Sequence, residues 1–522
     1  MKATNIFILC LSACMLSCQK DNGLEPSGKD NVFVEKKVIL DASQSYQTME
    51  GFGASDCWMT SVVGKSWINS RDKIAELLFS HDNGIALSMW RSNLGGGSAQ
   101  QGDASGITEV SRRMESYISE DGSLDWNMCE GQRFFLEKTK EYGCDNVVLF
   151  ANTPPVNYTY NGKGFSEKGG SANLKEEHYS SFADYMSAVA KHYIADGVKV
   201  SMISPVNEPQ YNWNNNTQEG SGYQNSEVAR LVRELDRSLE KDGLDIGILV
   251  PEAGDWSYLY TVKGDAGRSD QMKAFFSPSS ECYIGDLKHV RPIMCAHSYW
   301  TDNSWENLAY AREKVLSAAQ EYKLSLWQTE WSMLSDNFPA TEFPGYGLAS
   351  ELDIAMYMSK VIHHDLVTAN CASWSFWTAS DIERWGHMNR FLLVKLQVAS
   401  DKQPELEGSF RATKSLWTLG NYSRFIRPGY KRIELSIPYD SMNFFGSAWR
   451  SPDGKTIVEI YTNYSKKGAR LNHETLNLSD EVSSIVSYTT DSRSDLESKV
   501  LSVDQPIDLA PKSVTTVVYT LK

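Results

Sequence analysis

Short apolar runs alternate with longer amphipathic stretches from residue 50 to about residue 376. The runs have the length and composition of buried parallel strands and comprise residues 51–55, 85–90, 146–151, 200–206, 246–251, 292–297, 324–330 and 372–376. Between them, apolar residues recur with helical spacing at 71–80, 131–142, 176–194, 226–241, 305–322 and 351–365. Strands that alternate with helices in this number predict an α/β fold, a (β/α)8 TIM barrel, over residues 49–420. A doubly wound open sheet is the alternative, but no glycine-rich dinucleotide loop follows the first strand.

The pattern changes after about residue 420. Residues 432–437, 456–462, 482–488 and 513–520 alternate in polarity or are rich in β-branched side chains, and turn signals separate them. These features predict a side β-sandwich domain over residues 421–522. Residues 32–48 also have strand character, and we expect them to pair with this domain.

The N-terminus has the pattern of an export signal, with a basic start followed by an apolar segment at residues 6–11. Two lipobox-like tetrapeptides follow, one ending at Cys14 and one at Cys18. We predict a lipoprotein signal peptide over residues 1–18 with Cys18 lipidated (Cys14 is the alternative) and a flexible tether over residues 19–31. The chain would then be an exported outer-membrane lipoprotein of a Gram-negative bacterium, facing the periplasm or the cell surface. Ordinary secretion with cleavage nearby is the other possibility.

Composition narrows the class of partner. A formal charge of −15 argues against nucleic acid as a ligand. The 15 Trp and 25 Tyr favour a carbohydrate ligand, because aromatic faces stack on sugars, although a large core would also use them. We expect a monomer with no metal or organic cofactor, and contact with a membrane only through the lipid anchor. His363 and His364 fall on the polar side of a late helix, where solvent exposure is expected rather than metal binding.

Two glutamates end apolar runs. Glu208 follows the run at residues 198–206, and Glu330 ends the run that starts at residue 324. A carboxylate is expensive to bury at such a place unless it has a partner or a function. By strand count they end strands four and seven, and strand ends meet at the active face of a barrel. Two carboxyls about 5–5.5 Å apart are what retaining hydrolysis of a glycosidic bond requires. A structural ion pair is the alternative for either one.

Four segments carry a family resemblance. They are Glu-Gly-Phe-Gly-Ala-Ser at 50–55, Ser-Pro-Val-Asn-Glu-Pro-Gln at 204–210, Leu-Trp-Gln-Thr-Glu-Trp at 326–331 and Leu-Gly-Asn-Tyr-Ser-Arg-Phe-Ile-Arg-Pro-Gly at 419–429. In this order they resemble the first strand, the acid/base segment, the nucleophile segment and the domain junction of glycoside hydrolase family 30. The resemblance implies that Glu208 is the acid/base and Glu330 the nucleophile of a retaining double displacement.

The same resemblance implies further substrate-binding positions. These are Trp58, Arg91, Asn152, Asn207, Glu219, His297, Tyr299, Trp331 and Trp377. Asn207 would contact the sugar 2-hydroxyl, and Arg91 would hold the nucleophile ionised through a charge-assisted bond. His297 and Tyr299 would flank the nucleophile. Trp377 would lie under the sugar, although a purely structural role is the alternative for this tryptophan, for Arg91 and for Tyr299.

The substrate expectation depends on departures from other branches of the family. Asn152 stands where glucosylceramidase-like and xylanase-like members have a tryptophan, and residues 217–220 follow strand four. Both features are similar to the endo-β-1,6-galactanase branch, which predicts β-1,6-galactan of the arabinogalactan type as substrate. Residues 156–158 depart from that branch too. Other family activities stay open: β-fucosidase, β-glucosidase, β-1,6-glucanase, glucosylceramidase-like or xylanase activity. So does a non-catalytic glycan-binding lipoprotein.

Overall fold

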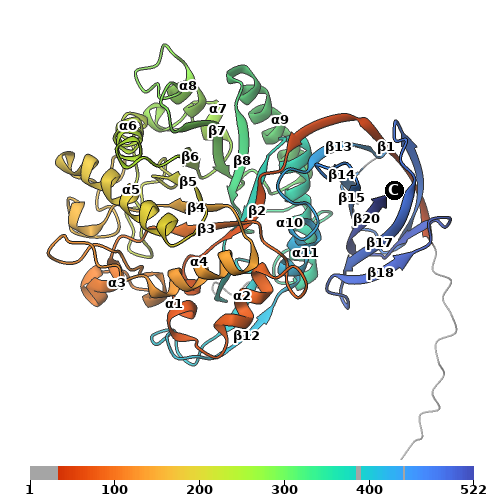
Figure 1. Cartoon of the computed structure of the whole chain (residues 1–522), viewed down its shortest axis with the longest axis horizontal. Coiled ribbons are helices and arrows are strands. Elements are labelled where there is room, and N and C mark those ends of the chain that lie inside the picture. The colour runs from red at the N-terminus through yellow and green to blue at the C-terminus, as the bar shows by residue number, and fades with distance from the viewer. Residues whose placement is uncertain (1–32, 384–389, 439–440) are drawn as a thin grey trace, which may run out of the picture. The chain divides into compact units, whose positions relative to one another are not determined.

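The computed structural model describes residues 33–383, 390–438 and 441–522 (Figure 1). The predicted signal peptide, both candidate lipidated cysteines and the tether lie outside these residues. Within the described ranges, no helix combines the length and the apolar character that a membrane crossing requires.

Eight parallel strands close into a barrel, which confirms the predicted fold class. They are β2 (Gly51–Ser55), β3 (Met89–Asn93), β4 (Val147–Phe150), β5 (Val200–Ser204), β6 (Gly247–Ala253), β7 (Val290–His297), β8 (Ser325–Glu330) and β9 (Ser373–Phe376). β9 pairs with β2 and so completes the circle. Side chains including Met89, Leu249 and Trp327 fill the barrel interior. The barrel is therefore a packed core, with room for chemistry at the strand ends.

Helices surround the barrel (Figure 1). The longer ones are α1 (Met59–Ser66), α2 (Arg71–Phe79), α4 (Glu130–Tyr142), α5 (Tyr179–Ala195), α6 (Asn225–Asp242), α9 (Trp305–Tyr322), α10 (Glu351–His363) and α11 (Lys414–Ser423). Short turns of helix are α3 (Ser98–Gln101), α7 (Ser257–Tyr260) and α8 (Gln271–Phe276). α6 shows why these segments are helical: it starts at a capping box between Gln224 and Glu227 and ends at Gly243, whose φ is 69°. Val228, Leu231 and Leu235 bury one stripe of it, each at a gain of about 1.5–3 kcal/mol.

The remaining strands form two further sheets. The larger has nine strands in the order β18-β17-β20-β15-β14-β13-β1-β16-β19. Their bounds are β1 (Phe33–Thr48), β13 (Lys431–Ser436), β14 (Phe444–Arg450), β15 (Thr456–Asn463), β16 (Gly468–Leu476), β17 (Val482–Thr490), β18 (Glu497–Leu501), β19 (Ile507–Leu509) and β20 (Ser513–Leu521). The smaller sheet, β10 (Ser380–Ile382), β11 (Val394–Gln397) and β12 (Ser409–Ala412), follows β9.

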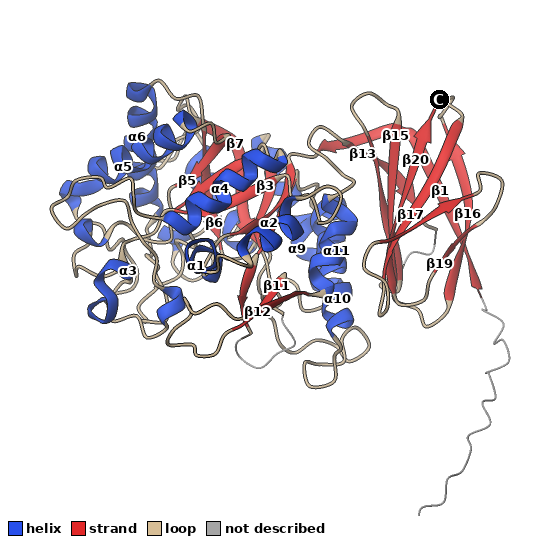
Figure 2. Ribbon diagram, turned by 60° about the horizontal axis from the view of Figure 1, so that its bottom comes forward, coloured by secondary structure: helices blue, strands red, loops and turns tan. Residues whose placement is uncertain are grey.

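The nine-stranded sheet folds back on itself into a sandwich (Figure 2). Nε2 of His473 on β16 lies 2.7 Å from Oε1 of Glu459 on β15, although three strands separate β15 and β16 in the sheet order. Side chains from both edge strands share one apolar core, as Leu501 on β18 and Leu509 on β19 show. β1 pairs antiparallel with β13 and parallel with β16.

Two sequence-based expectations differ from the structure. The second barrel strand is β3 at Met89–Asn93, several residues later than the apolar run at 85–90, so Arg91 lies inside it. β6 likewise continues past residue 251 to Ala253. In both cases the strand continues through polar residues that are buried at the barrel mouth. An apolar pattern therefore ends too early at such places.

The expected solvent exposure of His363 and His364 is wrong. Both side chains are buried. α10 ends at His363 and is covered by α11 and by strands β14, β15 and β20, whereas His364 begins the π-helical turn His364–Thr368, which packs on α9 with Trp305 against the His364 ring. Ser359 on the same helix lies 2.6 Å from Thr462 on β15, measured between the two hydroxyl oxygens. Burial lowers the pKa of His363 to about 3, so this ring is neutral in the folded chain.

Candidate active site

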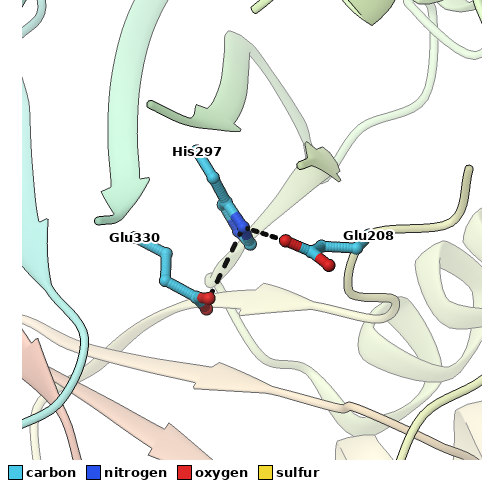
Figure 3. Close-up of side chains that lie close together, drawn as sticks. All are labelled: Glu208, His297 and Glu330. Atoms are coloured by element: carbon cyan, nitrogen blue, oxygen red, sulfur yellow. Dashed lines mark hydrogen bonds and ion pairs between the residues drawn. The ribbon is translucent and has the colours of Figure 1, made fainter. Parts of the chain in front are cut away.

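Three polar side chains converge where the barrel strands end (Figure 3). His297 is the last residue of β7, Glu330 is the last residue of β8, and Glu208 follows β5. Nδ1 of His297 lies 2.9 Å from Oε1 of Glu208 and 3.6 Å from Oε1 of Glu330. One side-chain nitrogen or oxygen from each residue lies within 4.8 Å of those of the other two. The nearest oxygens of the two carboxyls therefore lie closer together than the roughly 6.5–9.5 Å that separates an inverting pair.

Glu330 is held at both oxygens. Arg91 donates from Nη1 to Oε2 at 2.7 Å, and the Tyr299 hydroxyl donates to Oε1 at 3.0 Å. Burial raises the pKa of the Glu330 carboxyl, while the positive charges of His297 and Arg91 act against that rise. Arg91 itself is buried, donates from Nη2 to Oδ1 of Asn207 at 2.8 Å, and lies over the Phe150 ring. One guanidinium thus aligns the carboxylate of Glu330 and the amide of Asn207.

Glu208 sits in a bent segment just beyond β5. Its φ is 44°, a left-handed conformation that costs a non-glycine residue on the order of 1–3 kcal/mol and persists only where contacts enforce it. Its backbone N–H donates to the carbonyl of Glu252 at 2.8 Å, and its own carbonyl accepts from the indole of Trp213 at 3.2 Å. The Glu208 side chain is 15% exposed and that of Glu330 is 7% exposed, so Glu208 is the carboxyl with readier access to solvent.

A third carboxylate, Glu252, lies directly behind this pair. It is fully buried on β6 and accepts from Ser204 at 2.6 Å, from the Thr329 hydroxyl, and from Nε2 of His297 at 3.2 Å. Burial alone would raise the pKa of Glu252, but the charges of Arg91 and His297, with hydrogen bonds, lower it to about 2. Glu252 was not predicted as a site residue, because the apolar pattern ends the strand at residue 251. The signal was present: Glu252 ends an apolar run, as Glu208 and Glu330 do.

His297 connects all three carboxylates. Burial would lower the pKa of its ring, but Glu330, Glu208 and Glu252 together raise it to about 9. The ring is therefore an imidazolium at neutral pH, with both N–H groups facing carboxylates. In this trio, the positively charged His297 ring therefore lies between the carboxyls of Glu208 and Glu330.

Two hollows meet at this cluster. The inner one has a volume of 140 Å³, small for a ligand site, and is lined by Arg112, Asn152, Asn207, Glu208, Trp213, Gln218, Tyr299, Glu330, Ser332, Leu334, Trp377, Thr378, Asp381 and Phe391. The outer one has a volume of 410 Å³, and its lining includes Tyr211, Tyr258, Lys263 and Trp300. Both touch Glu208 and Tyr299. A ligand that fills both would therefore pass directly beside Glu208.

The structure brings most of the predicted site residues to the inner hollow. Asn152, Asn207, Tyr299 and Trp377 line it with the two glutamates. Gln218 lines it as well and belongs to the segment 217–220 on which the substrate expectation depends, whereas Arg112 and Asp381 line it and were not predicted. Arg112 and Asp381 lie on segments far apart along the chain, and nothing in their local pattern marks them as pocket residues.

Five predicted residues do not line the inner hollow: Arg91 and His297, which contact the glutamates as described above, and three side chains buried behind the residues that line it. Trp58 is fully buried and packs edge-on against Trp377, with ring centroids 5.8 Å apart. Trp331 is buried and its indole donates to Asp302 at 2.7 Å. Glu219 is fully buried and accepts from the backbone N–H of Gly96 at 2.9 Å; burial raises its pKa to about 7. These side chains support the loops around the hollow and do not line it.

Comparison with known proteins agrees with this architecture. Residues 35–386 match the family model described as O-Glycosyl hydrolase family 30. An endo-beta-1,6-galactanase from Hypocrea rufa is 24% identical over 433 residues, which cover 77% of this chain and 78% of that protein.

Two solved structures show the same fold. A conserved exported protein from Bacteroides fragilis superposes with a TM-score of 0.85 at 28% identity, over 92% of this chain and all of that one. The endo-beta1,6-glucanase BT3312 superposes with a TM-score of 0.62 at 17% identity, over 93% of this chain and 94% of that one. Since the family model spans well over half of the sequence, the chain belongs to glycoside hydrolase family 30 and is an O-glycosyl hydrolase.

Proposed function

We propose that this chain hydrolyses a β-glycosidic bond with retention of configuration, with Glu208 as acid/base and Glu330 as nucleophile. The observation that carries the proposal is the pair itself. Two carboxyl oxygens lie within 4.8 Å of each other, and the two carboxyls have different partners. Retention requires that spacing, together with one protonated and one ionised carboxyl.

Each step of the double displacement has a residue to perform it. Glu330 attacks the anomeric carbon as the bond to the leaving oxygen breaks, and Glu208 delivers its proton to that oxygen. Glu208, now ionised, takes a proton from water, and that water displaces Glu330 from the sugar. Arg91 and Tyr299 hold Glu330 in place through both oxygens. Because Arg91 also orients Asn207, the amide that would meet the sugar 2-hydroxyl is aligned with the nucleophile.

We propose β-1,6-linked galactan as the substrate class, cleaved internally. The relative from Hypocrea rufa supports this, since the similarity covers more than three quarters of both chains. Asn152 lines the inner hollow, at the position where the galactanase-like branch departs from other members of the family. The outer hollow, with exposed Tyr211 and Trp300, supports a leaving group of more than one sugar.

Exo-action is the second candidate, and the inner hollow favours it. A volume of 140 Å³ is well below that of a typical ligand site and suits a single sugar ring. An enzyme that binds only the terminal residue would release monosaccharide from the start of the reaction. An internally cleaving enzyme would first release a ladder of oligosaccharides.

The test is incubation with β-1,6-galactan, β-1,6-glucan, xylan and aryl β-glycosides of galactose, fucose and glucose. Products are sized by mass spectrometry, and their first-formed anomer is read by proton NMR. Oligosaccharides from galactan with β configuration are the expected result. An α anomer formed first would contradict retention, and activity on another polysaccharide alone would contradict the substrate.

We also propose that the chain is exported and anchored through a lipid on Cys18, with Cys14 as the alternative. The N-terminal pattern supports this, and the similar Bacteroides fragilis chain is described as an exported protein. Labelling with a fatty-acid analogue should be lost in C18A and retained in C14A. The reverse pattern would assign the lipid to Cys14, and labelling of neither wild type nor variant would contradict the anchor.

A further inference from the structure

We infer that Glu252 is a positioning residue of the active site: it fixes the spacing of Glu208 and Glu330 and serves as the counter-ion of His297. This inference rests on the proposed roles of the two glutamates. Nothing in the sequence pattern or the family comparison assigned a role to Glu252, and its side chain does not line either hollow.

Contacts from Glu252 reach the strands that carry both glutamates. Its backbone carbonyl accepts from the N–H of Glu208 at 2.8 Å, and its side chain accepts from Ser204, the last residue of β5, at 2.6 Å. On the opposite side, its other carboxylate oxygen accepts from Thr329, the residue immediately before Glu330. One side chain therefore ties β5 and β8 to β6. A movement of Glu252 would change the distance between the two reacting carboxyls.

The second argument is charge. Oε2 of Glu252 lies 3.2 Å from Nε2 of His297 and 3.5 Å from Nη2 of Arg91. With Glu208 protonated, the two cations are balanced by Glu252 and Glu330. Without the charge of Glu252, two cations would face a single anion in a buried site, and the one able to lose a proton is His297.

Other titratable groups around His297 do not replace that counter-ion. The ring faces Glu208 and Glu330 through Nδ1, and Tyr299 lies edge-on to it with ring centroids 5.7 Å apart. Burial raises the pKa of the Tyr299 hydroxyl and of the Cys295 thiol, which lies close to Glu252, so both stay neutral. Glu252 is thus the carboxylate that pairs with His297 and takes no part in bond making.

Backbone geometry points the same way. Glu252 has a φ of 59°, and Glu208 has a φ of 44°. Non-glycine residues in this region are uncommon and concentrate at functional sites. The two strained residues are joined by the hydrogen bond from Glu208 to the Glu252 carbonyl. The conformation of the acid/base segment is therefore coupled to that of Glu252.

The test is the variant E252Q in the full chain. Residues that orient reacting groups typically cost about 10–100-fold when replaced, and we expect a loss of that size in kcat with little change in KM. In 15N NMR the imidazole of His297 should titrate at lower pH than in wild type, because an anionic partner is gone. The basic limb of the kcat/KM profile reports the group that must be protonated for activity. Because loss of a nearby anion makes such a group easier to deprotonate, this limb should shift to lower pH.

The matched control is E459Q in the β-sandwich. Glu459 is also fully buried and also pairs with a histidine, His473, at 2.7 Å. This variant should lose stability but keep the wild-type kcat per folded molecule, pH profile and His297 titration. If E252Q behaves as E459Q does, the inference is wrong.

Should E252Q fail to fold, T329V and S204A remove single donors to Glu252 and leave its charge in place. Each should lower kcat, whereas T329S, which keeps the hydroxyl donor, should have the wild-type kcat. A wild-type kcat in both T329V and S204A would overturn the inference. The NMR titration separates this test from the proposed function. An inactive wild type would contradict the function, whereas an unchanged His297 titration in E252Q would contradict the role of Glu252.

Discussion

Arg91 and Glu330 form a buried ion pair at the barrel mouth, with Nη1 2.7 Å from Oε2, and the same guanidinium donates to Asn207 at 2.8 Å. Lysine keeps the charge but lacks the planar fork that makes both bonds. We therefore expect R91K to lower kcat by roughly 10²–10³-fold, the usual cost of one preorganised donor. Steady-state kinetics on the active glycan checks this. R411K is the control: Arg411 pairs with Glu351 at the surface, so its kcat should not change.

Substitution of the two proposed catalytic glutamates should reduce activity in different ways. E330Q should have no measurable turnover on any substrate, because the amide cannot form the glycosyl-enzyme bond. E208Q removes general acid catalysis and should lose about 10²–10⁴-fold on the glycan. It should lose far less on an aryl glycoside whose leaving group needs no proton. Equal losses on both substrates would contradict the acid role of Glu208, and substantial activity in E330Q would contradict the nucleophile.

The raised pKa of His297 makes stability depend on pH above neutrality. Its folded-state pKa of about 9 exceeds the usual value of 6.5, so its contribution is complete below pH 6.5 and is lost as pH rises through 9. Thermal unfolding should show Tm falling between pH 7 and 10, and H297Q should flatten that slope. H363Q is the control, since His363 has its pKa lowered to about 3 and affects stability only below pH 6.5.

The outer hollow should contribute to binding of the leaving group. Trp300 is 59% exposed, and removing an aromatic contact of about 1–1.5 kcal/mol corresponds to a rise in KM of roughly 5–12-fold. W300A should show this rise on polysaccharide and none on an aryl monoglycoside. Y310A removes a comparably exposed aromatic ring, 58%, from the outer helix α9 and should leave KM unchanged. Equal KM values for W300A and wild type on polysaccharide would argue against the outer hollow as a subsite.

Much of the architecture was predictable because barrel strands are continuous apolar runs. Periodicity is a local property, and the eight runs were recognisable without knowledge of their neighbours. Glu208 and Glu330 were predictable for the same reason, since each ends such a run. The apolar runs gave the wrong strand ends at β3 and β6, because Arg91 and Glu252 are buried polar residues within these strands.

The burial of His363 and His364 shows where prediction from sequence fails for helices. The helix that ends at His363 has polar residues on the side that was expected to face solvent, yet α11 and the sandwich strands cover it, and α9 packs on the turn that begins at His364. Glu219 and Trp331 show the same limit for loops, because both are strand-end or loop residues that support the site from behind. Whether a side chain faces solvent, lines the hollow or is buried behind it depends on packing partners that are far away in the chain.

The sequence by itself determined the barrel, the family and the positions of the two glutamates at strand ends. Strand patterns and short motifs can be recognised from consecutive residues. Tertiary structure alone decided the electrostatics: that His297 lies among three carboxylates and that Glu252 is one of them. A buried charge is tolerated only when opposite charges and donors surround it, and here those partners come from different strands of the barrel. The chemistry of the site is therefore a property of the closed barrel and of no single segment.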